Sequence, residues 1–307
     1  MCRAVHVVGM SSDATNADRH EAAVRVLARC ASTVPAEARR PLVRQYLADG
    51  PFSALAWLTG PSKPAGKLTA VSRAVTSTIA VRKWGAHELA ATEAGIRFLT
   101  AASPDWPAQL NELGDLAPLG LWVRGTIPDL SAGAVSIVGS RNLTATGHHH
   151  IDRAVAGLPV PVISGLATGA DETAHRMALR HRAPTIAVLP SGVDNVYPPR
   201  NRQLAERIVA QGGALLSEVP PRVGVQKWRF LDRNRIIAAL GTGSLIIEAG
   251  IQSGTMNEAG HARRLGRRIA AIPGTPGTDL LIADGTAHPA VSRTDIEALF
   301  EMDLMSS

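Results

Sequence analysis

The sequence has few cysteines, few aromatic residues and almost no lysine. Cys2 and Cys30 are too few for a disulfide framework or a cysteine metal cluster, and free thiols are typical of a reducing compartment. Aromatic residues form only 4% of the chain, which argues against a surface built mainly from stacking rings. No apolar run approaches the ~20 residues of a membrane span, and residues 1–10 are too short for a signal peptide. We therefore expect a cytoplasmic protein without membrane contact.

The charge is carried by arginine. Only four of the 32 basic residues are lysine, the net charge is +6 and the pI is about 10. This balance favours a polyanionic partner, because neutralising phosphates releases counterions. An arginine-rich, lysine-poor chain can equally reflect genome composition. With 307 residues, 45% of them hydrophobic, the chain is long enough for two domains.

Helical patterns fill the chain up to about residue 95. The stretch 21–30 is alanine-rich and amphipathic and is broken by Pro35. Three more helical stretches follow, with turn signals at Gly50-Pro51 and Gly60-Pro61 between them. We predict a small helical N-terminal (SAM-like) domain over residues 1–92, without a chemical motif. The further stretches are 44–48, 53–58 and 68–84.

From about Ala134 short apolar runs alternate with helix-length stretches. Near-continuous apolar strands separated by helices predict a parallel sheet covered on both faces. We therefore predict an α/β fold: a doubly wound, mostly parallel, Rossmann-like sheet over residues 129–290. A linker with an extension strand at 121–123 occupies 93–128, and 291–307 form a short tail. The predicted strands are 135–138, 160–163, 185–189, 214–216, 244–247 and 269–272.

Ligands of doubly wound folds bind at the carboxyl ends of the strands. The first strand ends in Gly139-Ser140-Arg141, with a helix predicted from Thr144. Free N–H groups at a helix start bind phosphate, and an arginine adds a forked cation. Ser253-Gly254-Thr255 opens a later helix in the same way. Taken alone, the short Gly139-Ser140-Arg141 loop fits a simple strand-to-helix turn better than a phosphate site.

Two further clusters follow predicted strands. Asp171 and His175 lie four residues apart and share a helix face, where capping and packing are favoured over a catalytic dyad. Arg233-Asn234-Arg235 stands where a helix over 236–240 is expected to begin. Arginines at a helix N-terminus oppose the helix dipole, so this placement indicates a nearby anion.

Several kinds of site have no support. The chain has no Walker A loop and no G-x-G-x-x-G motif, so neither ATP hydrolysis nor dinucleotide chemistry is expected. The run His148-His149-His150 would point its side chains about 100° apart on a helix, which suits a solvated face better than one metal ion. We expect no metal and no cofactor.

Seven segments, in this order and spacing, resemble the DNA-processing protein A family (DprA, also called Smf). The similarity covers roughly residues 93–285, and the helical N-terminal part carries no diagnostic residue. The segments are VSIVGSR (135–141), VISGLATGADETAH (162–175), AVLPSGVDNVYPPRN (187–201), LLSEVPP (215–221), FLDRNRIIAAL (230–240), IIEAGIQSGT (246–255) and AAIPG (270–274).

This resemblance implies single-stranded DNA binding, homodimerisation and delivery of DNA to a RecA-type recombinase in transformation or recombination, without catalysis. It also implies that Arg141, Arg233 and Arg235 contact DNA phosphates while glycine and serine positions shape the pocket. The DNA- or phosphate-binding set is Gly139, Ser140, Arg141, Gly165, Arg233, Asn234, Arg235, Ser253, Gly254 and Thr255.

The chain departs from the family pattern in three places. Thr168 stands where the family usually has an arginine, which removes one phosphate contact. The family's frequent winged helix is not expected, since the sequence ends soon after Leu299-Phe300. The segment 254–258 reads G-T-x-x-E, similar to the "Lonely guy" phosphoribohydrolases, which cleave the base from nucleoside 5′-monophosphates.

The third departure supports an alternative. Glu258 could stabilise an oxocarbenium-like centre or activate water, and Arg233 could orient the substrate phosphate. The hydrolases' preceding Pro-Gly-Gly stretch is absent here. A nucleotide-sensing module of the same superfamily is a further alternative.

Overall fold

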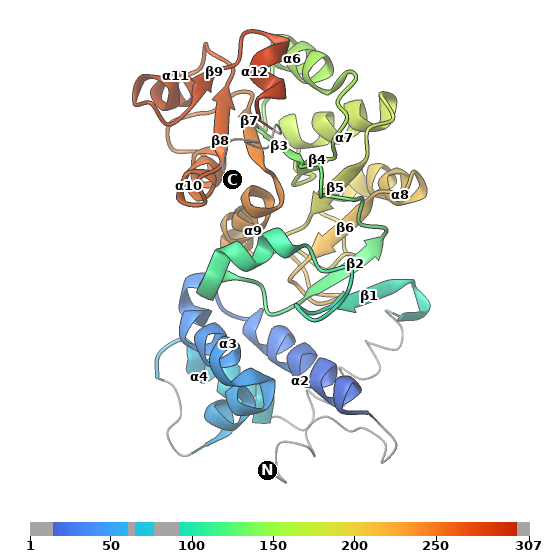
Figure 1. Cartoon of the computed structure of the whole chain (residues 1–307), viewed down its shortest axis with the longest axis vertical. Helices are drawn as coiled ribbons and strands as arrows, with labels where there is room; N and C mark the ends of the chain where they lie inside the picture. Colours follow the sequence, from blue (N-terminus) through green and yellow to red (C-terminus); the bar gives the residue numbers. More distant parts are fainter. Residues whose placement is uncertain (1–14, 61–64, 77–91, 300–307) are drawn as a thin grey trace, which may run out of the picture.

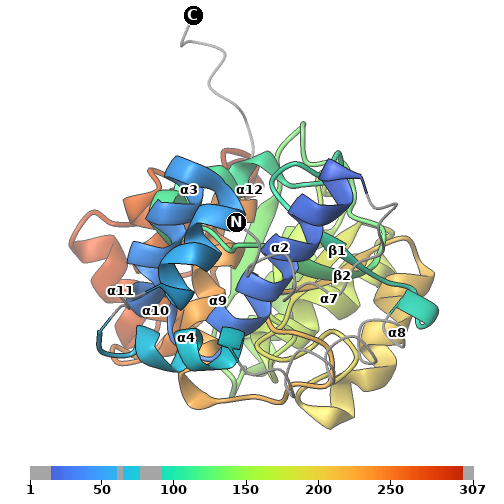
Figure 2. The same ribbon diagram turned by 90° about the horizontal axis from the view of Figure 1, so that it is seen from below.

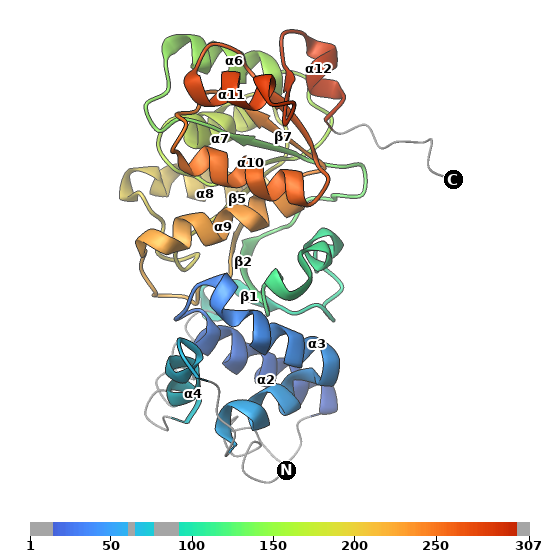
Figure 3. The same cartoon turned by 90° about the vertical axis from the view of Figure 1, so that its left-hand side faces the viewer.

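A computed structural model describes residues 15–60, 65–76 and 92–299 of the chain. The helices of the N-terminal part lie at one end of an elongated molecule, and the sheet with its covering helices forms the rest (Figures 1 and 3). None of the described helices is long and apolar enough to cross a membrane.

The N-terminal helices are α2 (Asn16–Ala31), α3 (Ala36–Thr59) and α4 (Leu68–Thr76). A capping box between Thr15 and Asp18 starts α2. Gly50, at φ 80°, breaks α3 where the turn was predicted. The predicted helix over 68–84 is described only as far as Thr76. Seen from this end, α2, α3 and α4 lie in front of the sheet (Figure 2).

The sheet has nine strands in the order β1-β2-β6-β5-β4-β3-β7-β8-β9. All six predicted strands are present, as β3 to β8, and every pairing among them is parallel. Antiparallel pairings join β1 to β2 and β2 to β6. The bounds are β1 (Ile96–Leu99), β2 (Leu121–Gly125), β3 (Val135–Val138), β4 (Val162–Ser164), β5 (Thr185–Val188), β6 (Ala214–Ser217), β7 (Gly243–Ile246), β8 (Arg268–Ala271) and β9 (His288–Pro289).

Helices cover both faces of the sheet, as predicted for a doubly wound fold. Val138 and its neighbours on one face pack against α9 and α10, while Val135 and Ile137 pack against α6 and α7 on the other. The helices of the core are η1 (Ala108–Leu116), α6 (Ala145–Val155), α7 (Ala170–Arg180), η2 (Pro199–Asn201), α8 (Arg202–Ala210), α9 (Lys227–Leu240), α10 (Gly254–Arg264), α11 (Pro276–Ala283) and α12 (Arg293–Glu297).

The order of the parallel strands fixes the switch point of the sheet. From β3 the chain steps outward through β4, β5 and β6, then returns to the other side of β3 as β7. The carboxyl ends of β3 and β7 therefore lie side by side while their following loops diverge, which opens a crevice between them.

The described parts of the predicted linker and tail both pack on the core. β1 and β2, from the segment 93–128, extend the sheet beyond β6. In the segment 291–307, α12 packs on the core, and Arg293 donates to the carbonyls of Ala154 and Gly157 at 3.3 and 3.1 Å.

Candidate functional site

A cavity of about 1110 Å³ lies at the switch point, at the carboxyl ends of β3 and β7. The loop after β3, the first half of α9 and the start of α10 form most of its wall. The residues predicted from sequence that line it are Gly139, Ser140, Arg141, Arg233, Asn234, Ser253, Gly254, Thr255 and, from the hydrolase alternative, Glu258.

Cations and aromatic rings gather at the mouth. Arg141 is exposed, and its guanidinium lies 5.2 Å from the ring centre of Phe230. The ring of Tyr197 packs edge-on against that of Phe230, with the two ring centres 5.8 Å apart. Lys227, exposed in the first turn of α9, lines the same cavity. Within the described residues, neither Arg141 nor Lys227 has a carboxylate partner.

The guanidinium of Arg233 is buried, and its hydrogen bonds go to the protein. Nη1 donates to the carbonyl of Val188 at 2.7 Å, and Nη2 lies 3.9 Å from the carboxylate of Asp171. Gly165 does not line the cavity. It supports this arrangement instead, because a Cβ there would lie 1.7 Å from Nη1 of Arg233. Only a glycine leaves room for the guanidinium.

Asn234 joins the two helices of the wall. Its side-chain amide donates to the carbonyl of Gly254 at 3.0 Å and to Asn257 at 3.2 Å, and its oxygen accepts from Nε of Arg233. These contacts fix the start of α10 relative to the middle of α9.

The two helix starts that the sequence proposed as phosphate sites differ. Ser253 caps α10 by accepting from Met256, so the first N–H groups of that helix are presented at the cavity wall. At α6, by contrast, the carboxylate of Glu248 accepts from both the N–H and the hydroxyl of Thr144. A protein carboxylate thus occupies the N-terminus of α6. The loop after β3 contributes Gly139, Ser140 and Arg141, but not its helix end.

The structure corrects the expected start of the helix that carries Arg233 and Arg235. This helix, α9, begins at Lys227, nine residues before the apolar run at 236–240. Both arginines therefore lie in its interior, and the dipole argument does not apply to them. Arg235 points away from the cavity, and Glu218 binds its guanidinium through both carboxylate oxygens at 2.9 and 2.7 Å.

Buried acids lie in the cavity wall. Burial raises the pKa of Glu258 to about 8, against a hydrogen bond from Ser244, with Asp171 adding to the rise. Among the described residues, its buried Oε2 has no hydrogen-bond partner. Burial also raises the pKa of Asp171, while Arg233 opposes the shift. His175 is buried and bonded to Thr185, and burial lowers its pKa to about 3, as expected for a packing residue.

Sequence reasoning missed part of the wall. Asn142, Gln226 and Lys227 line the cavity but belong to none of the loops singled out by motif. Lys227 had one available signal, since it is one of only four lysines and the only one after residue 83.

Fold and cavity together define a doubly wound α/β protein with a cationic crevice at its switch point. A family model described as DNA recombination-mediator protein A matches residues 97–301, and the chain belongs to this family. The putative DNA processing protein DprA of Mycobacterium tuberculosis is 40% identical over 195 residues, which are 59% of this chain and 50% of that protein. The DNA processing protein DprA of Streptococcus pneumoniae is 36% identical over 204 residues, 64% of this chain and 71% of that protein.

The chain thus spans about half the length of the mycobacterial relative. The X-ray structure of the Streptococcus pneumoniae protein matches with a TM-score of 0.70 and 26% identity, over 91% of this chain and 97% of that chain. A structure of DNA processing protein A from Helicobacter pylori, concerned with that protein's binding of single-stranded DNA, matches with a TM-score of 0.58 and 27% identity, over 66% and 95%. The match to the streptococcal structure includes most of the helical N-terminal part, because it covers 91% of the chain.

Proposed function

We propose that this protein binds single-stranded DNA at the switch-point cavity and hands it to a RecA-type recombinase. One observation carries the proposal: Arg141 and Lys227 line the cavity beside the rings of Phe230 and Tyr197, and no carboxylate in the described part of the chain pairs with either cation. Exposed cations suit backbone phosphates, and a ring suits the face of any base, so binding with little sequence preference follows.

The deeper groups have a second role in this proposal. Arg233 and Asn234 donate hydrogen bonds to backbone carbonyls and thereby hold the cavity wall in shape. The N–H groups at the start of α10 offer a further phosphate contact next to Gly254 and Thr255. Recombinase delivery, homodimerisation and a cytoplasmic location belong to the same proposal and rest on family membership.

Removing the exposed arginine at the mouth should weaken binding. We expect Arg141→Ala to raise the dissociation constant for oligo(dT) about tenfold, and to reduce the slope of log K against log salt by about 0.7, because one phosphate contact is lost. Fluorescence anisotropy over a series of NaCl concentrations measures both.

Arg207→Ala provides the matched control, because Arg207 is exposed on α8 and does not line the cavity. It removes the same charge and should change neither quantity beyond the general electrostatic effect. Absence of binding by the unmodified protein at low salt would refute the proposal. An equal loss of affinity in both variants would indicate that DNA binds outside the cavity.

Nucleotide hydrolysis is a second candidate, favoured by Glu258. This acid lines the cavity, and no group in the described segments forms a hydrogen bond with its Oε2. At neutral pH it is protonated, which suits a proton donor rather than a base. The same candidate needs Arg233 to hold the substrate phosphate, but that guanidinium is bonded to Val188 and lies beside Asp171.

The hydrolase candidate has a direct test. Prolonged incubation with AMP or dAMP should release free base, detected by chromatography, and Glu258→Gln should abolish the release. No base from the unmodified protein removes this candidate. Tight nucleotide binding without turnover would instead support a nucleotide-sensing module.

A further inference from the structure

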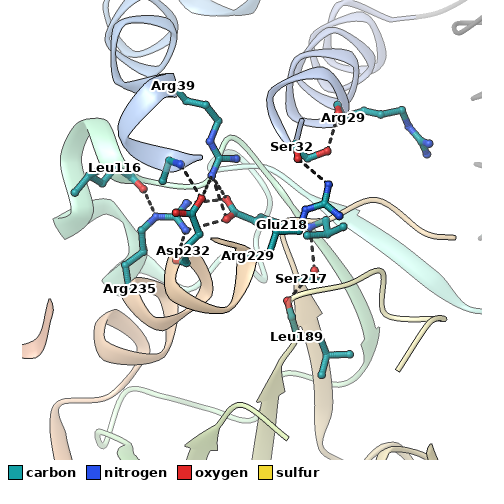
Figure 4. Close-up of polar contacts among 12 residues, drawn as sticks. Arg29, Ser32, Arg39, Leu116, Leu189, Ser217, Glu218, Arg229, Asp232 and Arg235 are labelled. Carbon is teal, nitrogen blue, oxygen red and sulfur yellow. Dashed lines mark hydrogen bonds and ion pairs between the residues drawn. The ribbon is translucent and has the colours of Figure 1, made fainter. Parts of the chain in front are cut away.

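Helix α9 presents two different faces. Lys227, Phe230, Arg233 and Asn234 line the cavity. Asp232, Arg235 and Arg229 face the other way (Figure 4). Their polar partners include Ala36 of α3, Ser32 at the end of α2, Leu116 at the end of η1, and Glu218. Any rotation or shift of α9 therefore changes both sites together.

The second face is held by a buried ionic cluster made of Arg39, Glu218, Asp232 and Arg235. Glu218 follows β6 and is paired with Arg235 of α9 at 2.7 Å and with Arg39 of α3 at 3.1 Å. Arg39 also lies 3.4 Å from Asp232. The side chains of all four are at most 14% exposed. The cluster thus ties α3, the end of β6 and α9 at one point.

Asp232 also makes a backbone contact across this junction. Its Oδ2 accepts the N–H of Ala36, the first residue of α3, at 2.7 Å. The residue before α3 is Pro35, which provides no capping side chain. A side chain of α9 thereby caps the N-terminus of α3.

The two arginines of the cluster keep Glu218 ionised. Burial alone would raise its pKa, but Arg235 and Arg39 outweigh burial and hold the pKa at about 2. Loss of Arg39 leaves Glu218 its two bonds from Arg235. Such a change should relax the junction, because Asp232 loses its ion pair with Arg39 and keeps the N–H of Ala36.

We propose that Arg39, Glu218 and Asp232 are positioning residues that set α9 for DNA binding, so that the N-terminal helices raise DNA affinity without touching DNA. This inference rests on the proposed function. Because α9 supplies Lys227 and Phe230 at the mouth, a cluster that fixes the helix from behind fixes these groups as well. By linkage, DNA bound at the cavity must in turn stabilise the junction.

The affinity test separates positioning from phosphate contact. We expect Arg39→Met to raise the oligo(dT) dissociation constant about threefold to tenfold while leaving the salt slope unchanged, because no phosphate contact is lost. Arg44→Met is the control: Arg44 lies on the same helix, is exposed and pairs with Asp115 rather than with α9. It should leave affinity and slope unchanged. Arg39→Lys, which keeps the charge, should recover part of the affinity.

Hydrogen exchange provides a second measurement on the unmodified protein, which keeps the inference testable if Arg39→Met does not fold. Saturating oligo(dT) should slow amide exchange in residues 36–40 at the start of α3, where Ala36 donates to Asp232. The start of α2, which has its own capping box, should be unchanged.

The outcomes are distinguishable. Binding by the unmodified protein with unchanged affinity in Arg39→Met, or unchanged exchange at 36–40, overturns the positioning role alone. A reduced salt slope in Arg39→Met would make Arg39 a phosphate contact and also overturn it. Absence of any DNA binding by the unmodified protein overturns the proposed function and this inference together.

Discussion

Glycines of the site differ in what they do. A Cβ at Gly165 would meet the guanidinium of Arg233 at 1.7 Å, whereas a Cβ at Gly254 would meet nothing within 4 Å. Both stand in family-like segments, and the sequence analysis predicted the same pocket-shaping role for both. The difference depends on a side chain 68 positions away in the sequence, so only the folded structure reveals it.

This difference predicts unequal effects on stability for two alanine substitutions. Gly165→Ala should lower the free energy of unfolding by about 1–3 kcal/mol, because Arg233 must leave a hydrogen-bonded position. Gly254→Ala, at the first position of α10, should change it by less than about 0.5 kcal/mol. Urea denaturation of both variants measures this, and equal losses would contradict the packing described here.

Glu258 predicts a pH dependence of stability. Its folded pKa of about 8 lies above the ordinary value of 4.5, so between these values the folded state binds one more proton than the unfolded state. The free energy of unfolding should therefore fall as pH rises towards 8, by up to about 1.4 kcal/mol per pH unit.

Comparison with Glu258→Gln from pH 6.5 to 8 isolates this effect. His175 and His261, with folded pKa values of about 3 and 4, are neutral in the folded state over this window and contribute equally in both proteins. Urea unfolding of Glu258→Gln over the same window should show a flatter dependence than the unmodified protein. Parallel curves for the two proteins would mean that Glu258 is already ionised at pH 6.5.

At the scale of the element, α9 connects the cavity to the N-terminal helices. Its apolar run over 236–240 was visible in the sequence, but its true start at Lys227 was not. The segment 227–235 is rich in charge, and three of those charged side chains are buried by contacts distant in sequence: Arg229, Arg233 and Arg235. Local sequence pattern does not reveal such partners. The family resemblance therefore implied a DNA contact for Arg235, whereas in the structure its guanidinium pairs with Glu218.

The start of α9 predicts opposite effects on stability and binding. Lys227 lies in the first turn, where a cation opposes the helix dipole, and Arg141 lies near the same mouth. Lys227→Glu should raise the free energy of unfolding by about 0.3 to 1 kcal/mol and weaken oligo(dT) binding. Urea denaturation and anisotropy measure the two. If Lys227→Glu is stabilised but binds oligo(dT) with normal affinity, Lys227 does not contact DNA.

At the scale of the whole molecule, the sequence predicted the sheet well and its ends poorly. Buried parallel strands are apolar on both faces, so β3 to β8 were readable from composition alone. β1 is four residues long, and β9 has two exposed residues, so neither gives a clear pattern. The N-terminal helices and the core share one apolar cluster and the ionic cluster around Glu218. Glu218 and Asp232 stand in family-like segments, but nothing in the sequence identifies Arg39 as their partner.

The central claim is that single-stranded DNA occupies the switch-point cavity between α9 and α10. Photo-cross-linking with an oligo(dT) that carries one 5-iodouracil tests it most directly, since the halogenated base couples to aromatic side chains in contact with it. The account predicts cross-links to Phe230 or Tyr197 at the mouth. Cross-links confined to residues distant from it, such as Trp57 on α3 or His288 on β9, would contradict the account.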